Sequence, residues 1–481
     1  MVKSVDSKLT LDEIYMQIGF GKFHIVIMIV LGLIRMCNNI EVLFLSFIGP
    51  ILVCVWKISL WKSSFVTISF FVGMGIGTLM FGKWSDIYGR KPILIMCMCV
   101  GLYCSMLNAL SPTLIWMIIT KFIVGFFSAG VILMVTTMLT EIMPIYHRGS
   151  VMVSLQIFAS FSSIYVTFLT YMLTESVGWR YSLVILISYM IIMTILAIFL
   201  PESPRYLLLI NNKSEALKIV NKIASINGVE HITNIKATKN KKPVFTDLFH
   251  KNYARTTLIL FYIFFVVGLD FMGLSLVAPL VNNIPHKCLQ GMIMNSNSSS
   301  KENTLPDNSC CIGLSWNTLK PMLISTFGEL SSSIISVYLV RFISRKLFIQ
   351  ILLAIIVMAC LLINLCVSSI YMGIILLFGR GAASSVYGVI FLYASEVLPT
   401  SIRGSGVGIF SSFARVGLMS SSIIVNIIMV QNSFLLGTII LITVNIVGCL
   451  LLFALPYETK DRTLLETVDD DVSKLMMKEN K

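Results

Sequence analysis

The chain has 481 residues, of which 57% are hydrophobic and 12% are charged. Soluble domains carry about 25% charged residues, so this composition excludes an ordinary water-soluble protein. The formal net charge of +13 does not indicate a nucleic-acid partner, because membrane proteins retain Lys and Arg in their cytoplasmic loops. Apolar runs of about 20 residues recur along most of the chain, each long enough to cross a bilayer as a helix. The composition therefore indicates an α-helical protein embedded in a lipid bilayer.

These runs predict twelve transmembrane helices, with both termini on the cytoplasmic side because the Lys and Arg residues gather there. The spans are expected at residues 24–52, 63–82, 92–110, 113–139, 150–174, 180–200, 257–281, 319–340, 347–368, 371–395, 405–430 and 433–455. A cytosolic arm at 1–23 precedes them, and a cytosolic tail at 456–481 follows. Residues 9–20 fit either an amphipathic helix at the membrane surface or a solvated arm, and residues 212–224 fit a short interfacial helix.

A sequence repeat divides the spans into two sets of six. The motif Glu-x-x-Pro-x-x-x-Arg-Gly occurs at Glu141–Gly149 and again at Glu396–Gly404, 255 positions later (396 − 141 = 255). Six spans repeated in the same orientation are typical of transporters that bind substrate near the midplane between two parallel halves. The repeat predicts six-helix halves at 24–200 and 257–455, joined by a cytosolic loop at 201–256.

The polar connection at 282–318 is expected on the outer side of the membrane. The glycosylation acceptor pattern Asn-Ser-Ser begins at Asn297, although such a pattern also arises by chance in a Ser-rich loop. In that oxidising compartment Cys288 is a candidate to form a disulfide with Cys310 or Cys311. Most of the 11 cysteines lie inside apolar runs instead, where we interpret them as packing residues.

Charged side chains inside the spans are candidates for substrate or ion contacts, because a charge that faces lipid has no partner. They are Arg35, Glu41, Lys121, Asp270, Arg380 and Arg415. Glu41 and Asp270 lie near the centres of corresponding helices, and we expect these two, with Asn38 one turn from Glu41, to contact substrate or protons. The alternative is a structural ion-pair network, such as Glu41 with Lys121 or Asp270 with Arg380. Four basic and two acidic residues leave the sign of the substrate open.

Other motifs favour packing over chemistry. Gly73, Gly75 and Gly77 predict close helix contact rather than a phosphate loop, since no strand precedes them. The five histidines form no metal-ligand pattern, and no nucleophile motif is present. We therefore expect neither a metal, nor a cofactor, nor enzyme activity.

The segment Gly82–Lys91 resembles the hallmark cytoplasmic loop between the second and third helices of the major facilitator superfamily. Together with the repeated motif and with Pro201–Arg205 and Pro456–Lys460, it is similar to the sugar and organic-ion branch. The opening Ile18–Phe23 and the large outer loop between spans 7 and 8 resemble the synaptic vesicle glycoproteins and the synaptic vesicle 2-related proteins, which are relatives of the organic ion transporters.

The resemblance implies the major facilitator fold and alternating-access transport of a small organic ion or polar metabolite, as a uniporter or linked to protons. It also implies a monomer in a synaptic or secretory vesicle membrane or in the plasma membrane. The alternative is a vesicle-resident binding or trafficking protein that keeps the transporter fold and transports little or nothing.

By the same resemblance a cytoplasmic gate is expected, although the alternative role as plain loop and topology determinants stays open. Its residues would be Gly82, Asp86, Gly89, Arg90, Glu141, Arg148, Glu396 and Arg403. The second copy of the hallmark segment, at 340–346, lacks the acidic residue and the glycine, so we expect a weaker or differently built gate there. Asn38 replaces an acidic residue of related first helices, which disfavours simple proton coupling at that position.

Overall fold

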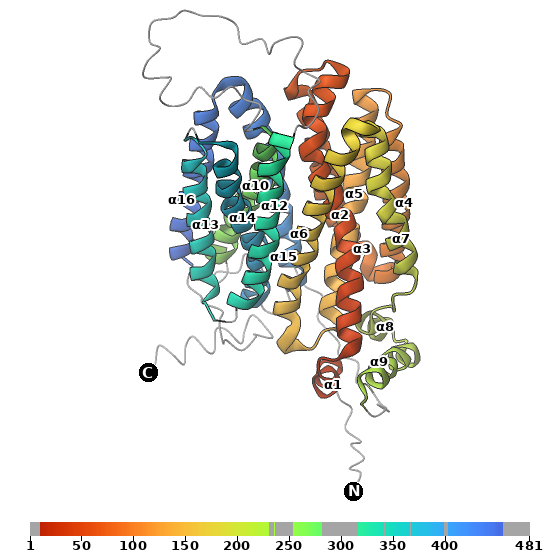
Figure 1. Ribbon diagram of the computed structural model, residues 1–481. Coiled ribbons are helices and arrows are strands. Elements are labelled where there is room, and N and C mark those ends of the chain that lie inside the picture. The colour runs from red at the N-terminus through yellow and green to blue at the C-terminus, as the bar shows by residue number, and fades with distance from the viewer. Residues whose placement is uncertain are drawn as a thin grey trace, which may run out of the picture.

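The computed structural model describes residues 10–229, 235, 254–280, 316–340, 342–365, 367–398 and 403–455, and its elements are helices (Figure 1). Among these residues, twelve helices are long and apolar enough to cross a membrane. They are α2 (Lys22–Trp56), α3 (Leu60–Tyr88), α4 (Arg90–Ala109), α5 (Leu114–Ile142), α6 (Ile145–Ser176), α7 (Trp179–Ile198), α10 (Ala254–Leu280), α12 (Trp316–Leu339), α13 (Arg345–Leu362), α14 (Ser369–Val397), α15 (Arg403–Ile423) with its π-helical continuation η2 (Ile424–Asn432), and α16 (Phe434–Phe453). The prediction of an all-α membrane protein with twelve spans is confirmed.

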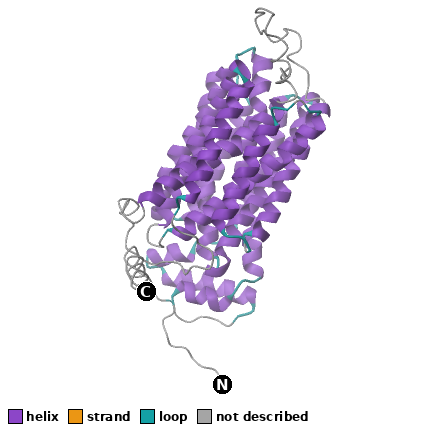
Figure 2. Cartoon of the chain, turned by 90° about the vertical axis from the view of Figure 1, so that its left-hand side faces the viewer, coloured by secondary structure: helices purple, strands orange, loops and turns teal. Residues whose placement is uncertain are grey.

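The long helices form two bundles whose axes run roughly parallel, α2 to α7 on the right of Figure 1 and α10 to α16 on the left (Figures 1 and 2). The same pairs pack in each bundle. In the first, α5 packs against α3 and α4, and in the second α14 packs against α12 and α13. Between the bundles, α6 packs against α12 and α14, and α3 packs against α15. Two parallel six-helix repeats, as the sequence repeat predicts, therefore make up the fold.

Glycines bring α3 into direct backbone contact with α5. A Cβ atom added at Gly73 or Gly77 would lie 2.1 Å from the Phe122 carbonyl oxygen or 2.3 Å from the Phe126 carbonyl oxygen. Gly75, between them, faces open space. Small residues that let helix backbones approach are a usual means of packing in a membrane. The prediction of close packing is thus confirmed for Gly73 and Gly77 and wrong for Gly75.

This difference predicts opposite effects for two neighbouring substitutions. Gly77→Ala is expected to destabilise the fold by about 1–3 kcal/mol, because the new methyl group overlaps a backbone oxygen that cannot move alone. Gly75→Ala is the matched control and is expected to leave stability unchanged or slightly raised, since alanine favours the helix. Thermal unfolding of the purified protein in detergent measures both. Equal losses of stability would contradict the assignment of the contact to Gly77.

Three short helices lie beneath the N-terminal bundle in Figure 1: α1 (Leu11–Ile18), α8 (Pro204–Leu209) and α9 (Lys213–Asn227). Helix α1 begins with a capping box, in which the Thr10 hydroxyl accepts from the Glu13 amide and the Thr10 amide donates to the Glu13 carboxylate. Its apolar face is buried, at Leu11, Ile14, Tyr15 and Ile18. The segment is therefore a packed helix and not a solvated arm.

Helix α9 confirms the short helix expected at 212–224. The Asn212 side chain caps its first turn by accepting from the Glu215 amide, and Gly228 ends it in the left-handed conformation. One face, with Ala216, Val220, Ile223 and Ala224, is buried.

The expected hallmark loop is a single-residue break between two helices. Helix α3 continues to Tyr88, α4 begins at Arg90, and only Gly89 separates them. Gly89 has φ +100°, and a Cβ there would lie 2.7 Å from a carboxylate oxygen of Glu202. A side chain would be strained by the backbone conformation and would also collide with Glu202, so glycine is required at this turn.

Candidate functional site

A polar face of α6 joins the two bundles at mid-height. Gln156, Ser160 and Ser163 follow one another at helical spacing and so point to the same side. The Gln156 amide donates to the Ser384 hydroxyl at 3.0 Å. The Ser160 hydroxyl donates to the backbone oxygen of Glu329 at 3.1 Å, and the Ser163 hydroxyl donates to the Glu329 carboxylate at 2.5 Å. The contact between the halves is therefore built from hydrogen bonds as well as from apolar packing.

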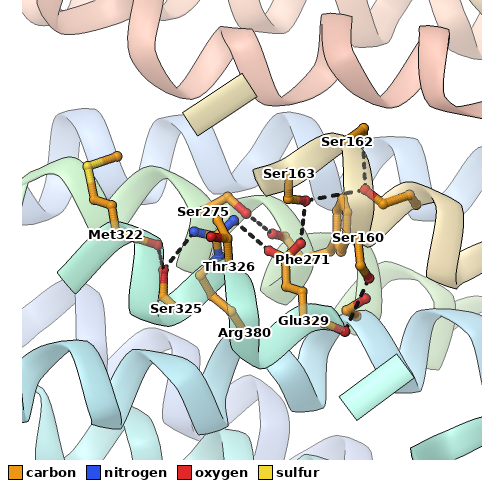
Figure 3. Close-up of polar contacts among 12 residues, drawn as sticks. Ser160, Ser162, Ser163, Phe271, Ser275, Met322, Ser325, Thr326, Glu329 and Arg380 are labelled. Atoms are coloured by element: carbon orange, nitrogen blue, oxygen red, sulfur yellow. Dashed lines mark hydrogen bonds and ion pairs between the residues drawn. The ribbon is translucent and has the colours of Figure 1, made fainter. Parts of the chain in front are cut away.

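Glu329 and Arg380 form a buried ion pair beside this face (Figure 3). Their side chains are 3% and 5% exposed, and the guanidinium and carboxylate groups are 2.5 Å apart. Arg380 also donates to the Ser325 hydroxyl at 2.9 Å. Glu329 was not among the candidates predicted from sequence. It is nevertheless a charged residue inside a predicted span, which is the feature that identified the other candidates. With Glu329 included, the spans hold four basic and three acidic candidates.

Glu41 lies on α2 and pairs with Lys121 of α5, inside the N-terminal half. The ammonium nitrogen is 2.6 Å from the carboxylate, and both side chains are at most 1% exposed. The ring of Phe44 lies 5.8 Å from the same nitrogen. The first of the two alternative ion pairs is confirmed.

Asp270 does not pair with Arg380, the partner considered for it in the structural alternative. Its carboxylate accepts a hydrogen bond at 2.8 Å from Asn445 of α16, inside the C-terminal half. The ion pair of Asp270 with Arg380 is wrong, because Arg380 binds Glu329 instead. Glu41 and Asp270 therefore do not meet: each carboxylate is buried within its own half.

A small cavity lies between the halves. Residues of both halves line it, among them Arg35, Asn38, Asn39, Gln156, Phe271 and Tyr387. Its volume of about 30 Å³ is enough for one or two water molecules and too small for an organic substrate. Of the residues singled out from the sequence, Arg35 and Asn38 line it. Arg415 lies next to it, because its guanidinium group interacts electrostatically with Tyr387, which lines the cavity.

At the end of the N-terminal half beside α1, α8 and α9, which is the end predicted to be cytosolic, Arg90 connects two carboxylates. Its guanidinium group lies 3.1 Å from Asp86 and 3.1 Å from Glu141. The side chain of Asp86 is 70% exposed, so its ion pair with Arg90 contributes little to stability. Arg90 and Glu141 are largely buried. The Glu202 carboxylate accepts the backbone N–H groups of Arg90 and Lys91, at the start of α4. The predicted residues Asp86, Arg90 and Glu141 thus form one network.

Arg148 belongs to a second network at the same end. Its guanidinium group lies 2.6 Å from Asp12 of α1, and Arg205 of α8 lies 2.7 Å from the same carboxylate oxygen. Burial alone would raise the pKa of Asp12, but the charges of Arg205 and Arg148 hold this pKa below its ordinary value. The contribution of this network to stability is therefore complete above the ordinary pKa of Asp and is lost only as the pH falls through the lowered one.

The second half keeps its arginine–glutamate pair. The Arg345 guanidinium group contacts Glu396 through two nitrogens, at 3.2 Å and 3.3 Å. Lys346 donates to the Leu455 carbonyl oxygen at 2.8 Å, beside the end of α16. This end of the second half is differently built, since the acidic residue and glycine are missing, but it still contains the counterpart of the Arg90–Glu141 pair.

The halves also touch at both ends. At the end predicted to be cytosolic, a Cβ atom at Gly149 would lie 2.7 Å from the side chain of Leu392 and 3.8 Å from the Glu396 carboxylate. At the opposite end, predicted to be the outer one, Asn426 of η2 donates to the Ser64 hydroxyl of α3 at 3.1 Å. The described parts of the halves thus touch at the centre and at both ends, and we call this arrangement occluded.

The other predicted residues fall into two groups. Gly82 is a packing position inside α3, and Arg403 begins α15, with its side chain outside the described part. The disulfide candidates Cys288, Cys310 and Cys311 and the glycosylation candidate Asn297 also lie outside the described residues. Within the described ranges the free cysteines include Cys37, Cys97, Cys99, Cys104, Cys360 and Cys449, and no cluster of metal-binding side chains is found.

With this geometry in view, comparison with known proteins identifies the family. The sequence profile of the family described as "Sugar (and other) transporter" matches residues 38–278. The chain belongs to this family. As a sugar (and other) transporter family member it is a multipass membrane protein of the major facilitator superfamily, which confirms the family resemblance read from its motifs.

Relatives of this transporter family member align with most of the chain. It is 27% identical over 467 residues to SVOPL of Mus musculus, covering 95% of this chain and 93% of that protein. It is 28% identical over 470 residues to the synaptic vesicle 2-related protein of Xenopus laevis, covering 96% and 83%. A partially occluded inward-open structure of the xylose transporter XylE from E. coli matches with a TM-score of 0.69 at 16% identity, covering 91% of this chain and 100% of that one. This structure shares the fold.

Proposed function

We propose that the chain moves a small organic ion or polar metabolite across its membrane by alternating access, as a uniporter or with proton coupling. One observation carries the proposal. The two halves meet through hydrogen bonds that can break and re-form, around a cavity lined from both sides. Membership of a transporter family supports the same function.

In this proposal the two end contacts are the gates. Separating Gly149 from Leu392 opens the cavity to the cytosol, and separating Ser64 from Asn426 opens it to the outer side. The cytosolic networks within each half keep the helix ends together while the halves rock. Their members are Asp86, Arg90, Glu141, Arg148 and Glu396, with Gly82 and Gly89 as packing and turn positions. We assign the same role to Arg403 from its place in the repeated motif. Asp270, whose partner is a neutral amide, is the candidate for a proton link because its protonation breaks no ion pair.

Reversible locking of each gate tests the mechanism. The pairs Gly149→Cys with Leu392→Cys and Ser64→Cys with Asn426→Cys are cross-linked in proteoliposomes, and uptake is measured across a panel of organic ions and polar metabolites. Each cross-link is expected to abolish uptake, and a reductant is expected to restore it. The matched control is Thr438→Cys with Asn364→Cys, two residues hydrogen-bonded at 3.0 Å inside the C-terminal half. This cross-link is expected to leave uptake intact.

Two outcomes would count against transport. Uptake that continues after complete cross-linking of either gate would rule out rocking of the halves. No uptake of any compound, together with capture of a binding partner by the intact protein in vesicles, would favour the alternative of a vesicle-resident binding or trafficking protein.

For the cellular location we propose a synaptic or secretory vesicle membrane, because several relatives carry the name synaptic vesicle 2-related protein. The plasma membrane is the alternative. Fractionation of cells that express the tagged full-length chain distinguishes the two.

A further inference from the structure

Two arginines, one from each half, meet at the central cavity without a carboxylate partner. Arg35 on α2 lines the cavity. Arg415 on α15 donates to the Ser411 carbonyl oxygen at 2.7 Å and interacts electrostatically with Tyr387, which lines the same cavity. The two guanidinium charges repel each other. Among the described residues, no Asp or Glu lies within ion-pair distance of either arginine.

Other buried basic side chains of the spans are neutralised. Lys121 is paired with Glu41, and Arg380 is paired with Glu329. Arg35 and Arg415 therefore leave a local excess of positive charge at the meeting point of the halves. An uncompensated charge inside a membrane protein is costly and marks a functional site.

The unpaired polar atoms around the cavity are hydrogen-bond donors. Nη1 of Arg35, Nε of Arg415 and Nδ2 of Asn38 are buried and have no hydrogen-bond partner. Arg415 and Asn38 are 3% and 6% exposed, whereas Arg35 keeps part of its surface accessible. Phe271 and Tyr387, with ring centroids 5.2 Å apart, add an aromatic wall. The site thus offers donors, positive charge and an apolar surface, and what it lacks is an acceptor with negative charge.

We propose that the substrate is a small organic anion whose carboxylate binds between Arg35 and Arg415. This inference rests on the proposed function and names its substrate class. The planar guanidinium group matches the two oxygens of a carboxylate, and the aromatic rings contact the organic part. Because the arginines come from opposite halves, the bound anion replaces their repulsion with attraction. It therefore favours an occluded arrangement in which the cavity, about 30 Å³ without substrate, has widened around the anion. The anion thereby promotes the conformational change that carries it across.

Ligand-dependent thermal stabilisation of the purified chain tests the substrate class. The probes are lactate, succinate and benzoate, their neutral amides lactamide, succinamide and benzamide, and the cations choline and tetraethylammonium. At least one carboxylate is expected to raise the melting temperature in a saturable way, while its amide and the cations do not. Arg35→Gln and Arg415→Gln are each expected to weaken the apparent affinity about 10- to 100-fold, the effect of losing one hydrogen-bonded charge. Lys218→Gln, an exposed lysine of α9, is the control for general salt effects.

The unliganded variants supply a second readout that a merely structural role would not give. Removing one of two repelling charges is expected to leave the melting temperature unchanged or to raise it, so the variants remain folded and measurable. A large fall in melting temperature for both would show that the arginines hold the fold together and would overturn the proposal. Absence of stabilisation by every carboxylate, or anion binding that survives in both variants, would also overturn it.

Uptake measurements separate this inference from the proposed function. Uptake of a cation or neutral compound that is unaffected by Arg35→Gln would support the proposed transport and contradict an anionic substrate. Carboxylate binding that depends on both arginines, without any uptake, would support the anion site and contradict transport.

Discussion

Lys121→Met is expected to destabilise the folded chain by about 3–5 kcal/mol, because it leaves the Glu41 carboxylate buried without its cation. The Glu41 side chain is 1% exposed, and its Oε1 atom already lacks a hydrogen-bond partner. Water therefore does not replace the lost ammonium group. Unfolding of the purified protein in detergent, followed by helical circular dichroism against temperature, measures the loss.

The double variant Lys121→Met with Glu41→Gln is expected to recover much of this stability. A neutral pair of similar volume has no uncompensated charge, and replacing both members of a buried pair is often close to neutral. Lys62→Met, at an exposed lysine near the outer end of α3, is the matched control and is expected to change stability by less than about 0.5 kcal/mol. A double variant as unstable as Lys121→Met would show that packing, rather than charge, causes the loss.

Arg380→Gln is expected to destabilise the occluded arrangement by about 3–5 kcal/mol for the same physical reason, now at the contact between the halves. Glu329 accepts from Arg380 and from Ser163 of the opposite half, so its unpaired charge draws water into the interface. We expect faster reaction of a cysteine at position 426 with a membrane-impermeant thiol reagent, together with impaired uptake. Arg380→Gln with Glu329→Gln is expected to restore much of the stability and little of the uptake.

Two adjacent serines separate the effect on the interface from the effect on the fold. Ser163→Ala removes a hydrogen bond between the halves, and Ser162→Ala removes one inside the N-terminal half, where Asn39 donates to Ser162 at 2.6 Å. A hydrogen bond to a charged group contributes about 1.5–3 kcal/mol. We therefore expect Ser163→Ala to increase cysteine reactivity about 10-fold or more, and Ser162→Ala to leave it near the parent value. Equal reactivity in the two variants would contradict the proposal that the contact between Ser163 and Glu329 holds the halves together.

The sequence predicted the fold because its signals are local. Span length and hydropathy depend on about 20 consecutive residues, so the helices could be placed to within a few positions. The repeat at 255 positions followed from the residues of Glu141–Gly149 and Glu396–Gly404 alone. Close contact at Gly73 and Gly77 was also foreseeable, whereas the open position of Gly75 was not, because it depends on which side of α3 faces α5.

The partners of buried charges were decided by the tertiary structure. An ion pair of Asp270 with Arg380 was compatible with the sequence, yet Arg380 binds Glu329 and Asp270 binds Asn445, since helix rotation sets the direction of each side chain. The same rotation turns Glu41 away from the cavity and Arg35 toward it. By itself the sequence determined twelve spans in two parallel halves and the family, because these depend on periodicity and spacing along the chain. Only the packing of the halves brought two unpaired arginines together, since that meeting depends on distances between helices that the linear chain does not encode locally.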